Sequence, residues 1–347
     1  MRRIVAVTAA AGLPMAMLMG CGSSGSQHGS SSSGVVTAAV ARQVLSHYVT
    51  VNNQANKLRQ DSLLATYEGG SSYQIDAGDY RWTLNSDPSN KNYSALSYVD
   101  PQFFIPMQSG YPAWFAVRTL QEDVPSLTKK ALMYLVFTKA SASAPWLDVR
   151  EPSAYGMPAG PQPQVAATSG YATQVSPSDA TGLALAPDKL PAQDVSFLDV
   201  GNIPTTSPRP GLPAPKRPKV INFANGTTGL GDVSDTSFWR SHMPSGSSVL
   251  DSHQATTDQI YVLRTTGGGA LVFYDLTASL TLGAPYAQPF SITIPGFFNN
   301  SQQSTSFTLN YVDQFAVYEP PGASATPQVV ADETGPVSGE CAGAPCS

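Results

Sequence analysis

The chain has 347 residues, which is long enough for one large domain or two ordinary domains with a sizeable hydrophobic core. Only 12% of the residues are charged, about half the share usual in soluble domains, and neutral polar residues together with 29 glycines and 29 prolines take their place. This composition excludes a coiled coil and a charge-rich disordered chain. A net charge of −5 excludes a nucleic-acid binder, because phosphates need positively charged partners.

The first twenty residues have the pattern of a bacterial export signal. A short basic start precedes an apolar run at 4–20, which is too short and too interrupted by proline for a membrane span. The run ends in Leu18-Met19-Gly20-Cys21, which resembles a lipobox, where the cysteine is lipidated and becomes the mature N-terminus. We therefore predict a lipoprotein signal peptide at 1–20 and lipidation at Cys21. A secreted protein with a non-lipidated signal is the alternative.

Residues 21–34 predict a lipidated cysteine followed by a flexible tether. Gly22 to Gly34 read GSSGSQHGSSSSG, and a random coil of this length spans about 20 Å. Two acyl chains on Cys21 would anchor the body stably. The predicted location is the cell membrane, lipid-anchored and facing the extracytoplasmic side, with an envelope protein or the cell wall as a further partner.

A helical pattern extends from about Thr37 to Tyr67. Apolar residues recur at intervals of three and four and form one stripe: Val40, Val44, Tyr48, Val51, Ala55 and Leu58. Gly69-Gly70 is expected to end the pattern. The polar side carries Asn52, Asn53 and Asn56, which either form a groove wall that contacts a ligand or mark a kink, because asparagine is a poor helix former.

Strand patterns follow, separated by turn residues. The predicted strands are Phe103 to Met107, Trp114 to Leu120, Ala131 to Thr138 and Pro145 to Val149, with a hairpin loop at 108–112. A helix followed by an antiparallel meander predicts an α+β lobe at 35–150, with one sheet face on the helix and the other free. A pocket between helix and sheet would be lined by Tyr48, Asn52, Trp114 and Phe115.

Residues 151–218 are dense in Pro, Gly and Ala and predict a semi-extended connector, with a short docked helix near Pro187 to Val200. A β-rich lobe is expected at 219–332. Its strands are Gln259 to Thr265, Ala270 to Leu282, Phe290 to Ile294, Ser306 to Tyr311 and Phe315 to Tyr318. The glycines at 267–269 predict a hairpin turn, since a phosphate loop would have to open a helix. The Arg-Thr endings at 118–119 and 264–265 hint at a duplication of two α+β lobes.

The remaining residues, 333–347, are expected to form a tail. Cys341 and Cys346 have C-x4-C spacing, and in an exported chain this favours a local disulfide over free thiols. A zinc site would need more ligands than this neighbourhood contains, so we predict no metal and no cofactor.

Two further groups of residues raise the question of catalysis. The segment 241–253, SHMPSGSSVLDSH, offers His242, Asp251 and His253 with candidate serine nucleophiles, but it has no G-x-S-x-G elbow. Glu68, Asp76 and Asp79 alternate with three aromatic residues, Tyr73, Tyr80 and Trp82. These residues could form a sugar- or peptide-contacting patch with paired acids, although solvated turn acids and core aromatics explain the same pattern.

Three segments carry a family resemblance: Asn52-Asn53-Gln54-Ala55-Asn56, Leu63 to Gly70, and the Arg-Thr/Gly-Gly-Ala-Leu-Val-Phe-Tyr hairpin. They resemble an uncharacterised family of actinobacterial lipoproteins, over Val35 to about Asp332. The order of helix and meander is also similar to the cone-shaped folds of the nuclear-transport-factor and cystatin types, a likeness of fold that implies no function.

The sequence thus favours a non-enzymatic lipoprotein that acts as an interaction or assembly module at the cell envelope. A lipoprotein that binds a small molecule or sugar in the helix–sheet pocket is the alternative. A hydrolase that uses the 242–253 segment ranks third.

Overall fold

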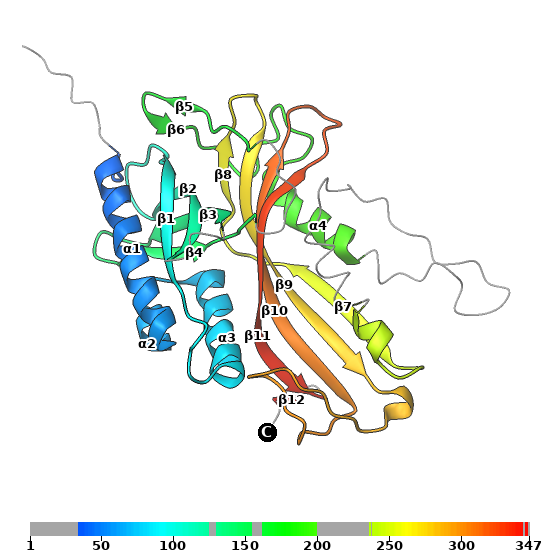
Figure 1. The fold of residues 1–347 in the computed structure, drawn as a ribbon. Coiled ribbons are helices and arrows are strands. Elements are labelled where there is room, and N and C mark those ends of the chain that lie inside the picture. Colours follow the sequence, from blue (N-terminus) through cyan, green and yellow to red (C-terminus); the bar gives the residue numbers. More distant parts are fainter. Residues whose placement is uncertain are drawn as a thin grey trace, which may run out of the picture. The chain divides into compact units, whose positions relative to one another are not determined.

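Two large antiparallel sheets, a small two-stranded sheet and several helices make up the part of the chain that the computed structural model describes, residues 34–124, 130–154, 162–199, 236, 238–342 and 344–345 (Figure 1). Contacts gather residues 33–347 into one compact unit. The signal peptide, Cys21 and nearly all of the tether lie outside the described residues, as does the 200–218 part of the expected connector. The fold class is α+β, as predicted.

The first sheet is a four-stranded meander in the order β1-β2-β3-β4. Its strands are β1 (Ala95–Phe104), β2 (Ala113–Val124), β3 (Lys130–Lys139) and β4 (Leu147–Arg150). The helices α1 (Ala38–Leu58), α2 (Asp61–Leu64) and α3 (Gly70–Ser86) precede it. The meander and the 108–112 loop between its first two strands confirm the sequence pattern.

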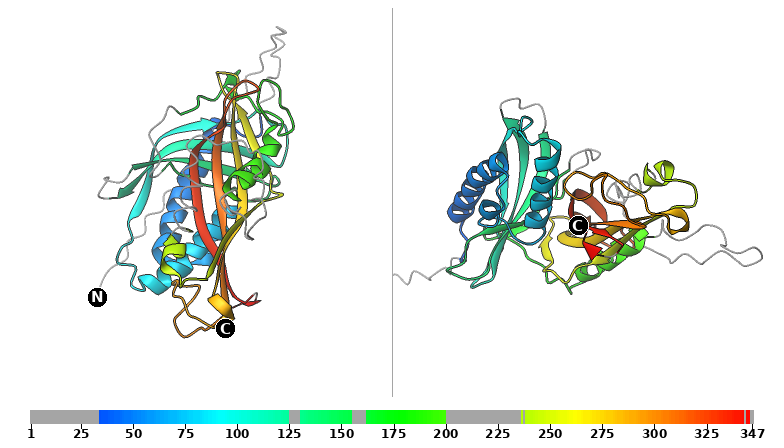
Figure 2. Two further views of the ribbon diagram at one scale, coloured as in Figure 1. Left: turned by 90° about the vertical axis from the view of Figure 1, so that its right-hand side faces the viewer. Right: turned by 90° about the horizontal axis from the view of Figure 1, so that it is seen from below.

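The second sheet has the order β12-β11-β10-β9-β7, and β8 also pairs with β9. Its strands are β7 (Ser248–Ala255), β8 (Tyr261–Arg264), β9 (Ala270–Gly283), β10 (Ser306–Glu319), β11 (Gln328–Cys341) and β12 (Ala344–Pro345). The three long strands β9, β10 and β11 lie side by side (Figure 2). The glycines at 267–269 form the predicted hairpin turn, in which the Thr265 N–H donates to the Gly269 carbonyl at 2.9 Å.

The period of two along each strand separates the core into layers. Phe115, Val117 and Leu135 of the first sheet pack with the helices, whereas Trp114, Ala116 and Tyr134 face the second sheet. In β9, alternate residues again divide between the two faces, and both faces are buried. The expectation that one face of the first sheet is free is therefore wrong, because the second sheet covers it.

Part of the expected connector belongs to this layered core. Residues 162–199 contain β5 (Ala167–Thr168), β6 (Tyr171–Ala172) and the predicted helix, α4 (Leu190–Leu198), which a 3₁₀ turn at Pro187–Lys189 precedes. Leu183, Leu190 and Leu198 pack on the second sheet, on the face opposite the first sheet (Figure 1). This proline-rich part of the chain therefore covers one face of the second sheet.

Three further sequence-based assignments need correction. Residues 306–319 form one strand, β10, where two were expected, and Phe290 to Ile294 contributes only isolated bridges. The expected tail is mostly strand, because β11 extends to Cys341. The sequence pattern also missed α3 and β7. The division into two duplicated lobes and the likeness to cone-shaped folds stay predictions.

Candidate functional site

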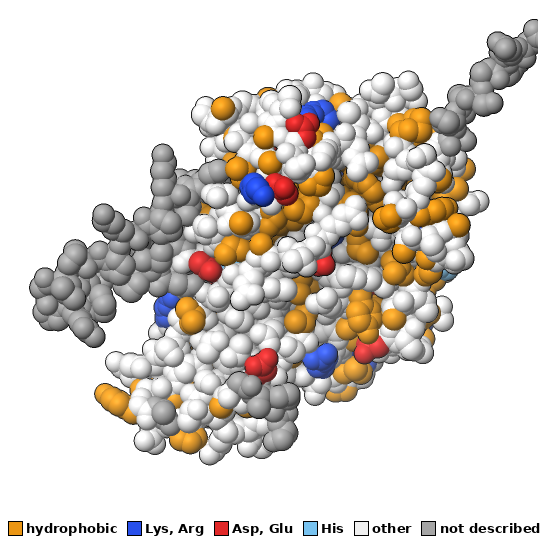
Figure 3. Space-filling view, turned by 180° about the vertical axis from the view of Figure 1, so that it is seen from behind, with side chains coloured by type: hydrophobic (Ala, Val, Ile, Leu, Met, Phe, Trp, Pro, Cys, Tyr) orange, Lys and Arg blue, Asp and Glu red, His pale blue; other side chains and the backbone are white. Residues whose placement is uncertain are grey.

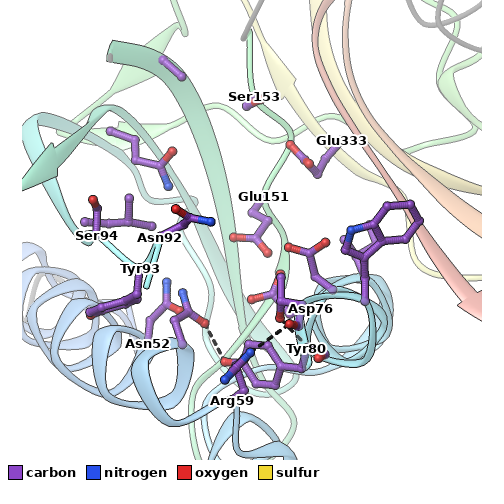
Figure 4. A pocket seen from close by; sticks show the side chains of 18 of the residues that line it. Asn52, Arg59, Asp76, Tyr80, Asn92, Tyr93, Ser94, Glu151, Ser153 and Glu333 are labelled. Carbon is purple, nitrogen blue, oxygen red and sulfur yellow. Dashed lines mark hydrogen bonds between the residues drawn. The ribbon is translucent and has the colours of Figure 1, made fainter. Parts of the chain in front are cut away.

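A pocket of about 600 Å³ opens among α1, α3, the first sheet and β11 (Figure 4). Its volume lies in the range of small-molecule sites. Amide, hydroxyl, carboxyl and aromatic side chains dominate its lining. The main contributors are Asn52, Asn56, Asp76, Asp79, Tyr80, Trp82, Thr83, Asn92, Tyr93, Tyr98, Gln121, Glu151 and Glu333.

The asparagines of α1 divide between this pocket and the first sheet. Asn52, which is 3% exposed, and Asn56 both line the pocket, and the Tyr80 hydroxyl donates to Asn56 Oδ1 at 2.5 Å. Asn53 points to the sheet edge, where its amide donates to the Leu96 carbonyl at 2.8 Å and accepts from the Leu96 N–H at 2.7 Å. The helix continues through all three positions to Leu58. Asn53 thus serves the sheet edge, whereas Asn52 and Asn56 belong to the pocket lining, where their Oδ1 atoms accept from the Tyr67 and Tyr80 hydroxyls.

The hydrophobic residues expected around this pocket lie elsewhere. Trp114 packs against Tyr261, with ring centroids 4.8 Å apart, on the face of the first sheet that meets the second. Phe115 stacks on Phe137 in the core beneath the helices. Tyr48 is buried beside the pocket, where its hydroxyl donates to Glu151 Oε2 at 3.0 Å. Of the four lining residues that the sequence indicated, only Asn52 forms part of the pocket surface.

Besides Asp87 at the C-terminal end of α3, four acidic residues from three parts of the chain line this pocket. Asp76 and Asp79 lie one turn apart on α3, Glu151 follows β4, and Glu333 lies on β11 (Figure 4). Burial and the neighbouring Asp79 raise the pKa of Asp76 to about 7. Burial, with Asp332 and Asp76 nearby, raises the pKa of Glu333 to about 8. Glu151 is buried among acids, which together raise its pKa well above the usual value.

The aromatic residues of α3 also divide between pocket and core. Tyr80 and Trp82 line the pocket, and Trp82 is 37% exposed, so part of its ring is open to solvent. Tyr73 packs instead against the core beneath α1 and α3. The sequence pattern offered a sugar-contacting patch of acids and aromatic residues. Part of that patch lies at the pocket, namely Asp76, Asp79, Tyr80 and Trp82.

Arg59 contributes a cation to the lining, and the two terminal nitrogens of its guanidinium group are hydrogen-bonded within the protein. It donates to the backbone carbonyls of Thr83, Asp87 and Pro88 at 2.9, 2.7 and 2.8 Å. These bonds fix the C-terminal end of α3 against α1. The side chains that a ligand would meet are therefore neutral or acidic in the main, which disfavours anionic ligands.

The histidines of the 242–253 segment lie in different surroundings. His242 stacks on Phe238, with ring centroids 4.1 Å apart. His253 lies on β7, a strand where a loop was expected, and its Nδ1 is 2.8 Å from Asp199 Oδ1. Its Nε2 is 3.9 Å from a carboxyl oxygen of Asp251 and likewise from one of Asp313. This is a buried cluster of acids around one histidine.

The C-terminal cysteines lie at the end of the second sheet. Cys341 is the last residue of β11 and is disulfide-bonded. Cys346, its predicted partner, lies outside the described residues.

Sequence reasoning missed Glu151 and Glu333 as pocket residues. Both lie far from α1 in sequence, and no local motif marks them. For α3, a usable signal was present: Asp76, Asp79, Tyr80 and Thr83 are spaced by three and four residues and share one face of a helix. Predicting that helix would have placed four lining residues on one surface.

Comparison with known proteins places the chain in a family. Residues 32–337 match "Domain of unknown function (DUF8094)". An uncharacterized lipoprotein of Streptomyces avermitilis is 26% identical over 83% of this chain and 80% of its own length. Two uncharacterized lipoproteins of Streptomyces coelicolor are 27% and 25% identical, over 71% and 69% of this chain and 65% of their own lengths. None of the helices within the described residues is long and apolar enough to cross a membrane. Since the matched segment covers most of the sequence, this chain belongs to the DUF8094 family.

Proposed function

We propose that this chain is a lipid-anchored binding protein of the extracytoplasmic face of the cell membrane, and that its pocket takes a small, neutral, hydroxyl-rich ligand such as a carbohydrate. The lipobox at Leu18 to Cys21 and the Gly/Ser-rich tether support the anchor. The relatives named as lipoproteins support it independently. Part of the protein surface has the neutral polar character expected from the composition, with few, scattered charges (Figure 3).

The composition of the pocket lining carries the ligand assignment. Amide and carboxyl groups can donate to and accept from the hydroxyl groups of a sugar, as Asn52 and Glu151 are placed to do. Trp82 and Tyr93 offer apolar ring surface to the carbon-bound faces of such a ligand. A ligand with many hydroxyl groups matches this combination better than an apolar molecule, which would leave the buried polar groups without partners.

A thermal-shift and calorimetric titration tests this function. The protein without its signal peptide would be titrated with glucose, galactose, N-acetylglucosamine, maltose and myo-inositol, with citrate as an anionic comparison. We expect saturable binding of at least one neutral compound and none of citrate. Binding of citrate alone, or of none of these compounds, would contradict the assignment.

A pair of variants on one helix localises the binding. Thr83 lines the pocket, and Asn85 lies two residues further along α3 outside the lining. Thr83→Trp should fill the pocket and weaken binding at least tenfold, whereas Asn85→Trp should bind like the wild type. Unfolding midpoints of both variants establish that they are folded. Equal binding by the two variants would place the ligand elsewhere.

A further inference from the structure

Glu68 is a buried acid behind the pocket, and its two carboxyl oxygens have no hydrogen-bond partner among the described residues. The residue is only 2% exposed. Its backbone is fixed, because the Glu68 N–H donates to the Leu64 carbonyl at 3.0 Å and Glu68 forms a parallel bridge with Asp148. An ionised carboxylate in such a place is costly unless a positive partner reaches it.

Two other carboxylates converge on Glu68. One oxygen each of Glu68, Asp76 and Glu151 lie within 4.8 Å of one another. Oxygen ligands bind Ca²⁺ at about 2.4 Å, so two ligands on opposite sides of the ion are about 4.8 Å apart. Separations within this span allow the three oxygens to share one Ca²⁺ ion. The Tyr48 hydroxyl, 3.0 Å from Glu151 Oε2, holds that carboxylate in position.

Protonation alone does not account for this arrangement. A proton would remove the charge of Glu68, but among the described residues no donor reaches its two carboxyl oxygens. Two arginines, Arg150 and Arg59, have other partners. Arg150 binds Asp275 through Nε and one terminal nitrogen, at 2.8 and 2.7 Å, and Arg59 binds backbone carbonyls.

We propose that Glu68, Asp76 and Glu151 form a divalent cation site at the inner end of the pocket, and that Ca²⁺ is its ligand. Carboxylate oxygens favour hard cations over the transition metals that prefer imidazole and thiolate. Ca²⁺ also tolerates irregular oxygen shells, whereas Mg²⁺ needs shorter bonds and near-octahedral geometry. This site goes beyond the proposed function, because it requires no carbohydrate.

A Ca²⁺ titration of chelator-treated protein tests the site. We expect Ca²⁺ to raise the unfolding midpoint of the protein. Calorimetry should show one binding site with a dissociation constant in the range of extracellular calcium modules, about 10⁻⁴–10⁻³ M. Mg²⁺ should bind at least tenfold more weakly. Glu68→Gln keeps the shape of the side chain but should abolish the Ca²⁺-dependent shift, and Glu151→Gln gives a second variant of the site.

Asp61→Asn is the matched control. Asp61 is an exposed acid on α2 that neither lines the pocket nor belongs to the three converging carboxylates. This variant should retain Ca²⁺ binding within about threefold. Failure of the wild type to bind Ca²⁺, or equal binding by wild type, Glu68→Gln and Glu151→Gln, would overturn the site. Because no sugar is present, these outcomes are distinct from failure of the carbohydrate assignment.

Discussion

At the scale of single residues, Arg150 links the two sheets. It is the last residue of β4 in the first sheet, and its guanidinium group makes two bonds to Asp275 of β9, with both side chains about 3% exposed. The guanidinium carbon also lies 5.0 Å from the ring centroid of Tyr261. A pair this well buried is sensitive to loss of either member, because the remaining charge is left without compensation.

Replacing Arg150 should therefore destabilise the protein strongly. We expect Arg150→Met to lower the free energy of unfolding by about 3–5 kcal/mol, measured by urea denaturation. The double variant Arg150→Met/Asp275→Leu should lose less than Arg150→Met alone, since it leaves no buried charge. A double variant at least as unstable as the single one would show that the ion pair itself, and not the orphaned charge, dominates.

Glu333 should make stability depend on pH. In the folded chain its pKa is about 8, raised by burial, against an ordinary value of 4.5. Between these two values the folded state holds a proton that the unfolded state has released, so the free energy of unfolding falls as pH rises. Asp76, with a pKa of about 7, acts in the same direction.

The measurement is a series of urea unfolding curves from pH 5 to pH 8 in the presence of chelator. We expect the urea midpoint of the wild type to fall across this range. The midpoint of Glu333→Gln should fall less, because the amide does not titrate. A midpoint that rises with pH, or the same slope in the variant, would contradict the assignment of this effect to Glu333.

At the scale of elements, α3 and β11 approach each other so closely that no side chain larger than glycine fits at Gly78 or Gly335. A Cβ atom added at Gly78 would overlap the carbonyl oxygen of Pro336, and one at Gly335 would lie 2.5 Å from Ile75 Cγ2. Glycine is normally unfavourable inside a helix. At Gly78 it is required, because the backbone of β11 occupies the space of a side chain.

Gly78→Ala should therefore have the opposite sign from most glycine-to-alanine changes in helices. We expect a loss of about 1–3 kcal/mol in the free energy of unfolding, because the helix must move away from the strand. Gly110→Ala is the control: its added Cβ meets no atom within 4 Å, so its stability should stay near that of the wild type. If Gly78→Ala were more stable than the wild type, α3 would be able to move away from β11 without loss of stability.

The same interface explains what the sequence could and could not predict. α1 begins after Thr37, whose side chain accepts from the Val40 N–H, and local pattern located this helix. The predicted stripe was wrong in part, because Leu58 is 55% exposed and Asn52, expected on the polar side, is buried. α3 contacts β4, β10 and β11, but its buried positions are mostly small or polar (Ser71, Ser72, Ile75, Gly78 and Tyr80), so no apolar stripe marks the helix. The gathering of Glu151 and Glu333 at the pocket follows from long-range packing, which no local pattern encodes.

At the scale of the whole molecule, two sheets back to back leave the pocket at one edge of their contact. The cluster of Trp114, Tyr261 and Phe273 fills the space between the sheets. The pocket instead receives Glu151 from the end of the first sheet and Glu333 from the second. Glu151 and Glu333 are therefore held in place by different sheets, and a change at the sheet–sheet contact should reach the pocket through their backbones.

The proposed membrane anchor would set where this molecule works, and this prediction rests on one atom, the Cys21 sulfur. Cys21→Ala removes the only acceptor for lipid in the Leu-Met-Gly-Cys sequence, and without acyl chains the tether has no attachment to the bilayer. We expect the variant either to leave the membrane fraction or to accumulate as an unprocessed precursor, as read by fractionation and intact mass. Cys341→Ala, which alters the C-terminal disulfide, should leave the lipid-modified N-terminus in the membrane fraction. A processed Cys21→Ala protein that stays with the membrane would show that something other than the lipobox holds this chain there.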